Sequence, residues 1–225
     1  MMISQPLLLA SASPRRRQIL SLLGLPFQVC VPPVNEEAMQ ERYTGPIEGL
    51  AVWLAEQKAL ETHKLPEAAG RLVITADTTV LLNGEVLGKP RDIAHARELL
   101  LSLRDRWHRV ITGVAVSKNI NGTIQVRSAS RTTPVLMRPY SEEDVAAYIA
   151  TEDPMDKAGA YGIQHRSFQP TARINGCYLN VVGLPLCTLV SLLAEFDVYP
   201  AVAIEHKPGR CPWSERCIIQ QEVPA

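Results

Sequence analysis

The chain lacks net charge, because its 23 lysines and arginines equal its 23 aspartates and glutamates over 225 residues. This balance argues against a protein that binds nucleic acid through bulk charge, and against an acidic disordered tail. Local basic clusters, which a phosphate site needs, remain compatible with it. With 46% hydrophobic and 20% charged residues, the composition indicates an ordinary globular chain with one large domain or two small ones.

Long hydrophobic runs are also lacking. The most apolar stretch, residues 181–196, is interrupted by Gly183 and Pro185 and is too short to cross a bilayer. The first residues do not form a signal peptide, because their apolar segment is short and Arg15-Arg16-Arg17 follows at once. We therefore expect a cytoplasmic protein with no membrane partner.

A disulfide framework is the third absence. The five cysteines are an odd, scattered set: Cys30, Cys177, Cys187, Cys211 and Cys217. His206, Cys211 and Cys217 would supply three ligands of a zinc site, but no fourth ligand is evident and their spacing is not that of known zinc motifs. The sequence thus favours a fold that depends on its hydrophobic core.

Strand and helix signals alternate along the chain, which is typical of an α/β fold. Strands are predicted at residues 7–10, 27–31, 72–75, 79–82, 85–87, 109–118 and 123–137. Helices are predicted to begin at Ser13, Asp92 and Ser141, which are capping residues, and to cover residues 47–64 and 185–196. Asn83-Gly84 predicts a tight hairpin, and residues 32–46 read as a loop.

The segment between the first strand and the first helix is a candidate phosphate site. Ser11 and Ser13 offer hydroxyls, and Arg15 and Arg16 offer guanidinium groups, beside the N–H groups of a helix N-terminus. A capped helix with solvated arginines explains the same residues equally well.

Three further segments carry candidate polar groups. Asp77 follows a buried strand, where an acid can hold a metal ion or take a proton from water, or can simply cap a turn. Lys89 follows a glycine and offers a point charge for phosphate, although a solvated turn lysine is the alternative. Gln164 ends the Gly-containing segment 156–164 and can pair with the edge of a base, unless that segment is a structural loop.

Taken together and in order, these segments resemble the Maf family of nucleoside triphosphate pyrophosphatases. The resemblance covers about residues 5–197 and rests on residues 8–16, 76–78, 87–90, 156–164 and 180–185. It implies an elongated, mixed and twisted sheet with flanking helices and two lobes around a cleft, as in inosine triphosphate pyrophosphatases. It also implies that water attacks the α-phosphorus of a nucleoside triphosphate and releases pyrophosphate. The form of segment 156–164 resembles the branch that hydrolyses dTTP and UTP.

The resemblance also implies roles for single residues. Asp77 matches the proton acceptor, and Gln164 and Thr78 match base-reading positions; with Arg15 they match the positions that separate the branches. Phosphate binding is expected from Ser11, Ser13, Arg15, Arg16, Lys58 and Lys89, where Lys58 is otherwise an ordinary helix lysine. A divalent cation, Mg²⁺ or Mn²⁺, is expected on Glu37, Asp77 and Asp156, with Glu36 as the fallback for Glu37.

The domain expected from this resemblance spans residues 1–197, and residues 198–225 form a C-terminal extension of unknown role. His165-Arg166 departs from the glycine that usually follows Gln164, so the rim of the site is expected to differ. A homodimer is expected by family analogy alone. The alternative function is a nucleotide-binding regulatory protein, linked to septum formation, that hydrolyses little.

Overall fold

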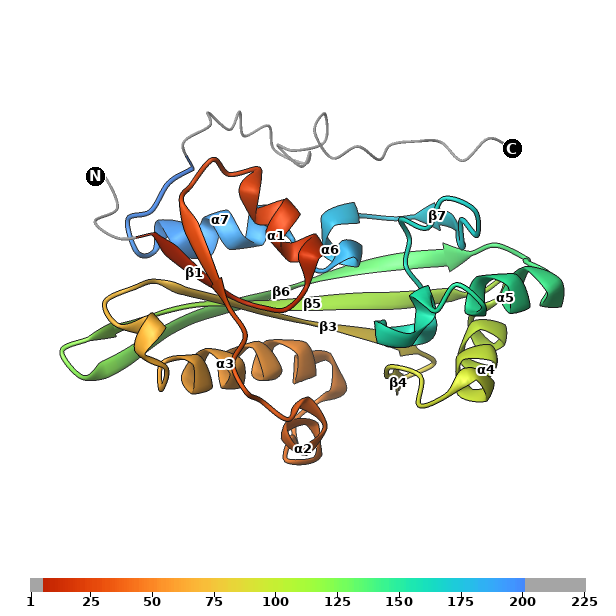
Figure 1. Ribbon diagram of the computed structural model, residues 1–225, viewed down its shortest axis with the longest axis horizontal. Coiled ribbons are helices and arrows are strands. Elements are labelled where there is room, and N and C mark those ends of the chain that lie inside the picture. The colour runs from red at the N-terminus through yellow and green to blue at the C-terminus, as the bar shows by residue number, and fades with distance from the viewer. Residues whose placement is uncertain (1–5, 201–225) are drawn as a thin grey trace.

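One mixed β-sheet runs the length of the molecule in the computed structural model, which describes residues 6–200 (Figure 1). Within that range the sheet has seven strands in the order β2-β1-β3-β5-β6-β7, and β4 pairs with the end of β3. The strands are β1 (Leu7–Ala10), β2 (Phe27–Cys30), β3 (Val73–Leu82), β4 (Glu85–Leu87), β5 (Trp107–Ile120), β6 (Thr123–Met137) and β7 (Thr171–Ile174). The expected α/β class with a mixed sheet is confirmed.

Strand direction divides the sheet into a parallel and an antiparallel part. β1 pairs in parallel with β2 and β3, whereas β3, β5, β6 and β7 pair antiparallel. Parallel neighbours need crossover connections, and α1 (Pro14–Ser21) lies between β1 and β2 in the chain. Antiparallel neighbours need only turns, and the predicted Asn83-Gly84 turn joins β3 to β4 with a positive φ at both residues.

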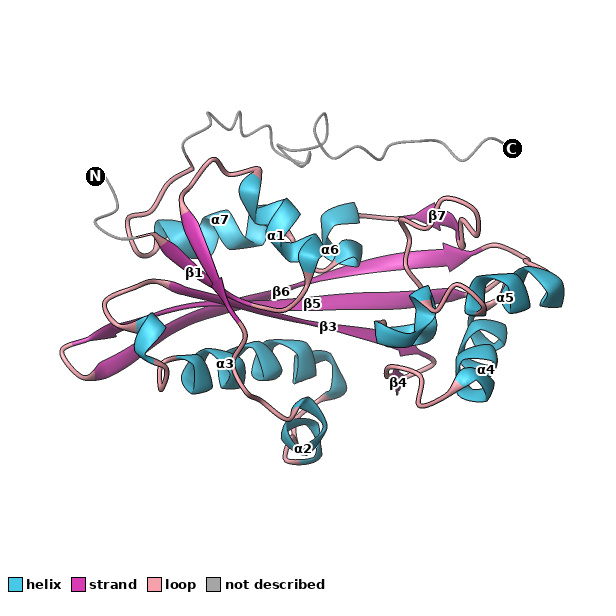
Figure 2. Ribbon diagram, viewed as in Figure 1, coloured by secondary structure: helices cyan, strands magenta, loops and turns pink. Residues whose placement is uncertain are grey.

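Helices cover both faces of the sheet (Figure 2). α1, α6 (Tyr178–Val182) and α7 (Leu186–Ala194) lie on one face; α2 (Glu36–Glu41) and α3 (Leu50–Thr62) lie on the other; α4 (Ile93–Leu103) and α5 (Glu142–Ile149) lie at one end. Short 3-10 turns occur at Ile47–Gly49, Pro66–Ala68, Asp153–Asp156 and Ala158–Ala160. Among residues 6–200, no helix is long and apolar enough to cross a membrane.

The capping residues begin their helices as the sequence predicts. Ser13 and Asp92 each accept a hydrogen bond from the backbone N–H three residues ahead. Ser141 and Asp144 form a reciprocal capping box at the start of α5. These ends were predictable because a cap depends on residues that are close in the chain.

Helix α3 packs unusually close to the sheet. Its buried residues include Ala51, Ala55 and Ala59, and a Cβ added to Gly113 of β5 would lie 2.3 Å from the carbonyl oxygen of Ala51. A side chain at Gly113 would therefore clash with helix backbone, which cannot move aside easily. Glycine at this position fixes the height of α3 above the strands and thereby the position of the side chains that α3 turns toward them.

A polar strip separates two hydrophobic clusters on the other face of the sheet. One cluster contains Ala76 and Val114 and continues into α1 and α7; the other contains Val80 and Val110 and continues into α4 and α5. Along β3 and β5 the residues between these pairs are Thr78 and Thr112, which lie opposite each other in the register. The two threonines thus separate the two hydrophobic clusters at the middle of the long strands.

The structure differs from the sequence prediction in four places. Residues 32–46 are not all loop, because Asn35 accepts the N–H of Ala38 and begins α2. Residues 72–75 and 79–82 belong to one continuous strand, β3. Strand β7 and helix α6 were not predicted, since both are short and lack a periodic pattern of apolar residues.

Part of the predicted extension falls outside the described residues. The description ends at Pro200, so most of segment 198–225 is outside it, as are His206, Cys211 and Cys217. The zinc alternative and the role of the extension therefore remain predictions.

Candidate active site

A cleft of about 1210 Å³ opens along one edge of β3. It is lined by every residue for which the sequence predicts a site role: Ser11, Ser13, Arg15, Arg16, Glu36, Glu37, Lys58, Asp77, Thr78, Lys89, Asp156 and Gln164. The edge is open because β1 pairs with β3 only as far as Ile74, and β4 pairs with β3 only from Val80 onward. The cleft therefore sits in a gap between two neighbours of the same strand.

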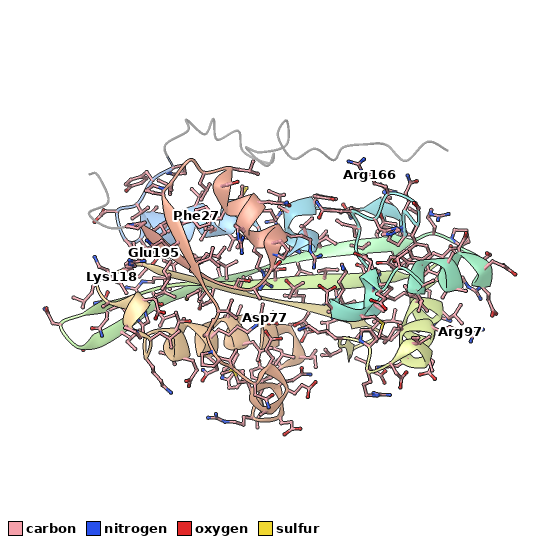
Figure 3. The ribbon with its side chains drawn as sticks, viewed as in Figure 1. Phe27, Asp77, Arg97, Lys118, Arg166 and Glu195 are labelled. Atoms are coloured by element: carbon pink, nitrogen blue, oxygen red, sulfur yellow. The ribbon has the colours of Figure 1, made fainter. Side chains whose placement is uncertain are left out.

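Asp77 lies in the middle of β3 and near the middle of the molecule (Figure 3). The expectation that it follows the end of a strand was wrong, because β3 continues past it as the antiparallel neighbour of β5. The strand that ends near Asp77 is instead β1, the parallel neighbour of β3. Successive residues of a strand face opposite sides of the sheet, so Asp77 points toward α3 and Thr78 toward α1 and α6. The cleft thus receives polar groups from both faces of one strand.

Lys58 joins two acids at the α3 side of the cleft. Its Nζ lies 2.6 Å from Asp77 Oδ1 and 2.6 Å from Glu36 Oε1. The Lys58 and Asp77 side chains are 6% and 12% exposed, so their ion pair is largely shielded from water, whereas the Glu36 side chain is 43% exposed. Lys89 Nζ approaches the second oxygen of Glu36, Oε2, at 3.3 Å. The cleft therefore holds an alternating set of two lysines and two carboxylates from four separate segments.

The two lysines control the charge of Glu36. Burial raises the pKa of this carboxyl, but the attraction and hydrogen bonds of Lys58 and Lys89 outweigh burial and lower its pKa to about 2. Glu36 is therefore ionised at any pH at which an enzyme normally works. A carboxylate that is always charged is suited to binding a cation.

Of the two neighbouring acids, Glu36 and not Glu37 faces the lysines. Both lie in the first turn of α2, where successive side chains are about 100° apart around the helix axis. Glu37 lines the cleft but is exposed, and it forms no ion pair with another described residue. The geometry thus favours the fallback, Glu36, as the acid that shares Lys58 with Asp77.

On the opposite side of β3, the guanidinium of Arg16 is held by three groups. Nε donates to the Gly183 carbonyl at 2.8 Å, Nη1 to Ser11 Oγ at 3.4 Å, and Nη2 to Thr78 Oγ1 at 3.2 Å. Burial lowers the pKa of Arg16, and Asp77 and Glu36 oppose that shift. An arginine remains protonated under such shifts, so it presents a fixed positive charge to the cleft.

The segment that carries Gln164 forms another part of the wall. Gln164 is exposed and lines the cleft, as predicted. Lys157, which was not predicted as a site residue, is a buried residue of this segment, with Nζ 2.9 Å from Asp153 Oδ1 and 2.7 Å from Asp156 Oδ1. Its position directly after Asp156 in the matched segment was the available signal. These ion pairs of Lys157 therefore stabilise the conformation of the segment.

This segment is also tied to its surroundings by two hydrogen bonds. The backbone N–H of Gly159 donates to the Gly88 carbonyl at 3.0 Å, next to Lys89. Tyr161 Oη lies 2.6 Å from His108 Nε2 of β5, and both side chains are buried. The predicted base-reading segment is therefore connected to the residue before Lys89, for which phosphate binding is predicted, and to the sheet.

The predicted metal ligands are not gathered into one site. Among the residues that the structure describes, no three histidine, cysteine, aspartate or glutamate side chains are close enough to hold a metal ion together. Asp156 forms an ion pair with Lys157, and Glu37 is exposed. Neither acid therefore joins Asp77 in a common metal site. Glu36 and Asp77 do converge on one nitrogen, and two carboxylates together with substrate phosphates are a donor set that fits Mg²⁺.

His165 and Arg166, where the sequence departs from the expected glycine, lie at the rim of the cleft. His165 Nδ1 accepts the backbone N–H of Phe168 at 3.0 Å, and its ring lies 4.7 Å from that of Tyr148. Arg166 is exposed and extends outward (Figure 3). The departure therefore changes the entrance and leaves the acid–lysine group intact.

The chain is similar to known proteins over most of its length. The family model described as "Maf-like protein" matches residues 6–196. A dTTP/UTP pyrophosphatase of Dehalococcoides mccartyi is 44% identical over 206 residues, covering 91% of this chain and 89% of the relative. A dTTP/UTP pyrophosphatase of Gloeobacter violaceus is 44% identical over 191 residues, covering 85% of this chain and 96% of the relative. Because the family model spans most of its length, the chain belongs to the Maf family.

Proposed function

We propose that this protein is a pyrophosphatase that hydrolyses dTTP and UTP to the monophosphate and pyrophosphate. The observation that carries the proposal is the Lys58 bridge between Asp77 and Glu36, set in a cleft whose other side presents Arg16. A base, a pair of carboxylates and several fixed cations are what hydrolysis of a triphosphate needs. The relatives named above carry this activity in their names.

In the proposed reaction, Asp77 takes a proton from the attacking water. Its Oδ1 accepts a hydrogen bond from Lys58, which leaves Oδ2 to receive the proton. The water oxygen bonds to the α-phosphorus while the bond from that phosphorus to the bridging oxygen breaks. The electron pair leaves with pyrophosphate, whose growing negative charge is stabilised by the nearby cations. Those cations are Arg15, Arg16, Lys58 and Lys89, assisted by the hydroxyls of Ser11 and Ser13.

A divalent cation, Mg²⁺ or Mn²⁺, fits the carboxylates of Glu36 and Asp77, and we prefer this pair to the original set of Glu37, Asp77 and Asp156. When bound, such an ion would neutralise phosphate charge and lower the pKa of a coordinated water. Lys58 would share these carboxylates with the ion, because its Nζ contacts both of them. Gln164 offers one donor and one acceptor, which match the N3–H and the adjacent carbonyl of a thymine or uracil base.

We further propose that residues 1–197 form the nucleotide pyrophosphatase domain, with its two lobes on either side of the cleft as in inosine triphosphate pyrophosphatases. Segment 198–225 is then an extension to this domain. We place the activity in the cytoplasm, and family analogy allows a homodimer.

The test is pyrophosphate release from a panel of nucleoside triphosphates, with Mg²⁺ and then Mn²⁺, in water enriched in ¹⁸O. We expect turnover of dTTP and UTP, with the label in the monophosphate, because water attacks the α-phosphorus. Turnover of other bases alone would overturn the assignment of Gln164. Label in the pyrophosphate would overturn attack at the α-phosphorus. Nucleotide binding without turnover would favour the regulatory alternative.

A further inference from the structure

A chain of hydrogen bonds runs from Arg16 into the middle of the sheet. Thr78 Oγ1 accepts from Arg16 Nη2 at 3.2 Å and lies 2.9 Å from Thr112 Oγ1. Thr112 Oγ1 donates to the carbonyl oxygen of Asn180 at 2.8 Å. A hydroxyl has one proton, so Thr112 must accept from Thr78, and Thr78 must accept from Arg16. Every donor in the chain therefore has a fixed direction.

Asn180 is the last residue of this hydrogen-bonded series, and it is fully buried, with an exposed fraction of 0%. Its Oδ1 accepts the backbone N–H of Thr112 at 3.2 Å, and its Nδ2 donates to the Val110 carbonyl at 2.9 Å and to Thr133 Oγ1 at 3.0 Å. All polar atoms of the side chain are thus bonded. A buried network that is completely satisfied permits one arrangement and strongly disfavours others.

The same short helix also holds Arg16 from a second direction. Gly183, which ends α6 with a φ of +119°, accepts from Arg16 Nε at 2.8 Å. A Cβ at Gly183 would lie 3.3 Å from Thr78 Oγ1 and 3.5 Å from Arg16 Nε. A side chain there would therefore crowd Thr78 Oγ1 and be in van der Waals contact with Arg16, at a φ that disfavours any residue with a Cβ. Asn180 and Gly183 belong to one of the matched sequence segments, for which the proposed reaction supplies no role.

We infer that Asn180, Thr112 and Gly183 are positioning residues that fix the Arg16 guanidinium at the open edge of β3. Arginine has five N–H donors, and three are engaged by Gly183, Ser11 and Thr78, which leaves one on each Nη for a phosphate. This inference rests on the proposed function for the identity of the ligand. It also gives Thr78 a role different from base reading, since its only proton is donated to Thr112.

The position of these residues between the two hydrophobic clusters explains why they matter. Thr78 and Thr112 form the polar strip that divides the core, and Asn180 covers it. A displacement of about 1 Å at a phosphate-binding group can reduce the rate about a hundredfold. The polar strip therefore fixes the position of the Arg16 guanidinium in the cleft through Thr78.

The test is a double-mutant comparison of pyrophosphate release from dTTP. Thr112→Val removes the hydroxyl and keeps the branched shape, and we expect it to lower kcat/KM about tenfold. Thr112→Ser restores the hydroxyl and should recover most of that loss. In an Arg16→Lys background, which lacks the guanidinium fork, Thr112→Val should change kcat/KM less than about twofold, since the two residues act as one unit.

Gly183→Ala perturbs the same guanidinium from its other side and serves as a second variant if Thr112→Val does not fold. It should show the same dependence on Arg16. Tyr140→Phe removes one buried hydroxyl, which donates to the Leu100 carbonyl at 2.5 Å and belongs to a residue that does not line the cleft. It is the matched control for lost stability. It should leave kcat/KM unchanged.

A loss of the same size in the wild-type and Arg16→Lys backgrounds would overturn the inference, because it would show that Thr112 acts independently of Arg16. If the wild-type protein binds dTTP but releases no pyrophosphate, the proposed function fails by itself. The wild type, the two single variants and the double variant are then compared by calorimetric dTTP affinity, and the same interaction between Thr112 and Arg16 is expected. Additive losses of affinity would overturn the inference in that case too.

Discussion

Lys58 Nζ lies 2.6 Å from Asp77 Oδ1 and so joins the middle of α3 to the middle of β3. The distance depends on how closely α3 approaches the sheet, which Gly113 permits. The same nitrogen holds Glu36 of α2. One buried lysine thereby organises the acids of the cleft, and several consequences can be measured.

Replacing this lysine should remove most of the activity. Lys58→Met leaves two carboxylates facing each other without their shared cation and removes a group that stabilises phosphate charge. We expect kcat for dTTP to fall roughly 10²–10³-fold, as when one stabilising donor is lost elsewhere. Lys64→Met, at an exposed lysine just beyond the end of α3 that pairs with Glu61, is the control and should retain normal kcat. Similar kcat values for the two variants would contradict the role of Lys58.

The neighbouring acids Glu36 and Glu37 should respond very differently to neutralisation. Glu36→Gln removes the charge that Lys58 and Lys89 hold, and we expect the Mg²⁺ concentration for half-maximal activity to rise about 10–100-fold. Glu37→Gln changes an exposed carboxylate and should alter it less than about threefold. A titration of activity against Mg²⁺ measures both. A larger effect at Glu37 would restore the first assignment of the metal ligand.

His108 predicts a pH dependence of stability. Burial lowers its pKa from 6.5 to about 4. Between those values the unfolded chain takes up a proton that the folded protein does not, so its stability is complete above pH 6.5 and falls as the pH drops toward 4. The difference is roughly 3 kcal/mol in the free energy of unfolding. Urea unfolding across this pH range should show a flatter profile for His108→Gln, and an unchanged slope would contradict the assignment.

Gly113 should tolerate no side chain. In Gly113→Ala the new Cβ would meet the Ala51 backbone at 2.3 Å, so α3 must move away from β5. We expect a loss of about 1–3 kcal/mol in the free energy of unfolding, together with reduced turnover because Lys58 moves with the helix. Gly88→Ala is the control for stability, since no atom lies within 4 Å of its Cβ position. The free energy of unfolding of both variants is measured by chemical denaturation. Equal values for the two variants would contradict the close approach of α3 to β5.

Much of the fold was predictable because its signals are local. Ser13, Asp92 and Ser141 mark helix starts through contacts three residues away, and Asn83-Gly84 marks a hairpin through its own φ values. The strand at residues 123–137 is predicted with the observed bounds. Most of the site residues that line the cleft were also predictable, because the matched segments carry them. Glu36, Glu37 and Lys58 lie outside those segments and were expected only from the wider family resemblance.

What the sequence did not predict depends on distant contacts. β3 reads as two strands because small and polar residues stand at 76–78, and its continuity comes from pairing with β5. The choice between Glu36 and Glu37 depends on the orientation of α2, which is too short to show a periodic pattern. Thr112 and Asn180 are 68 residues apart, so nothing in the chain indicates that they meet.

The most direct test of the proposed mechanism is pyrophosphate release from dTTP and UTP by Asp77→Asn at saturating nucleotide. The amide keeps an oxygen for Lys58 but cannot take a proton from water, so we expect nucleotide affinity within about threefold of the wild type and a kcat reduced about 10²–10⁴-fold. Wild-type kcat in this variant, at equal nucleotide occupancy, would show that Asp77 is not the base.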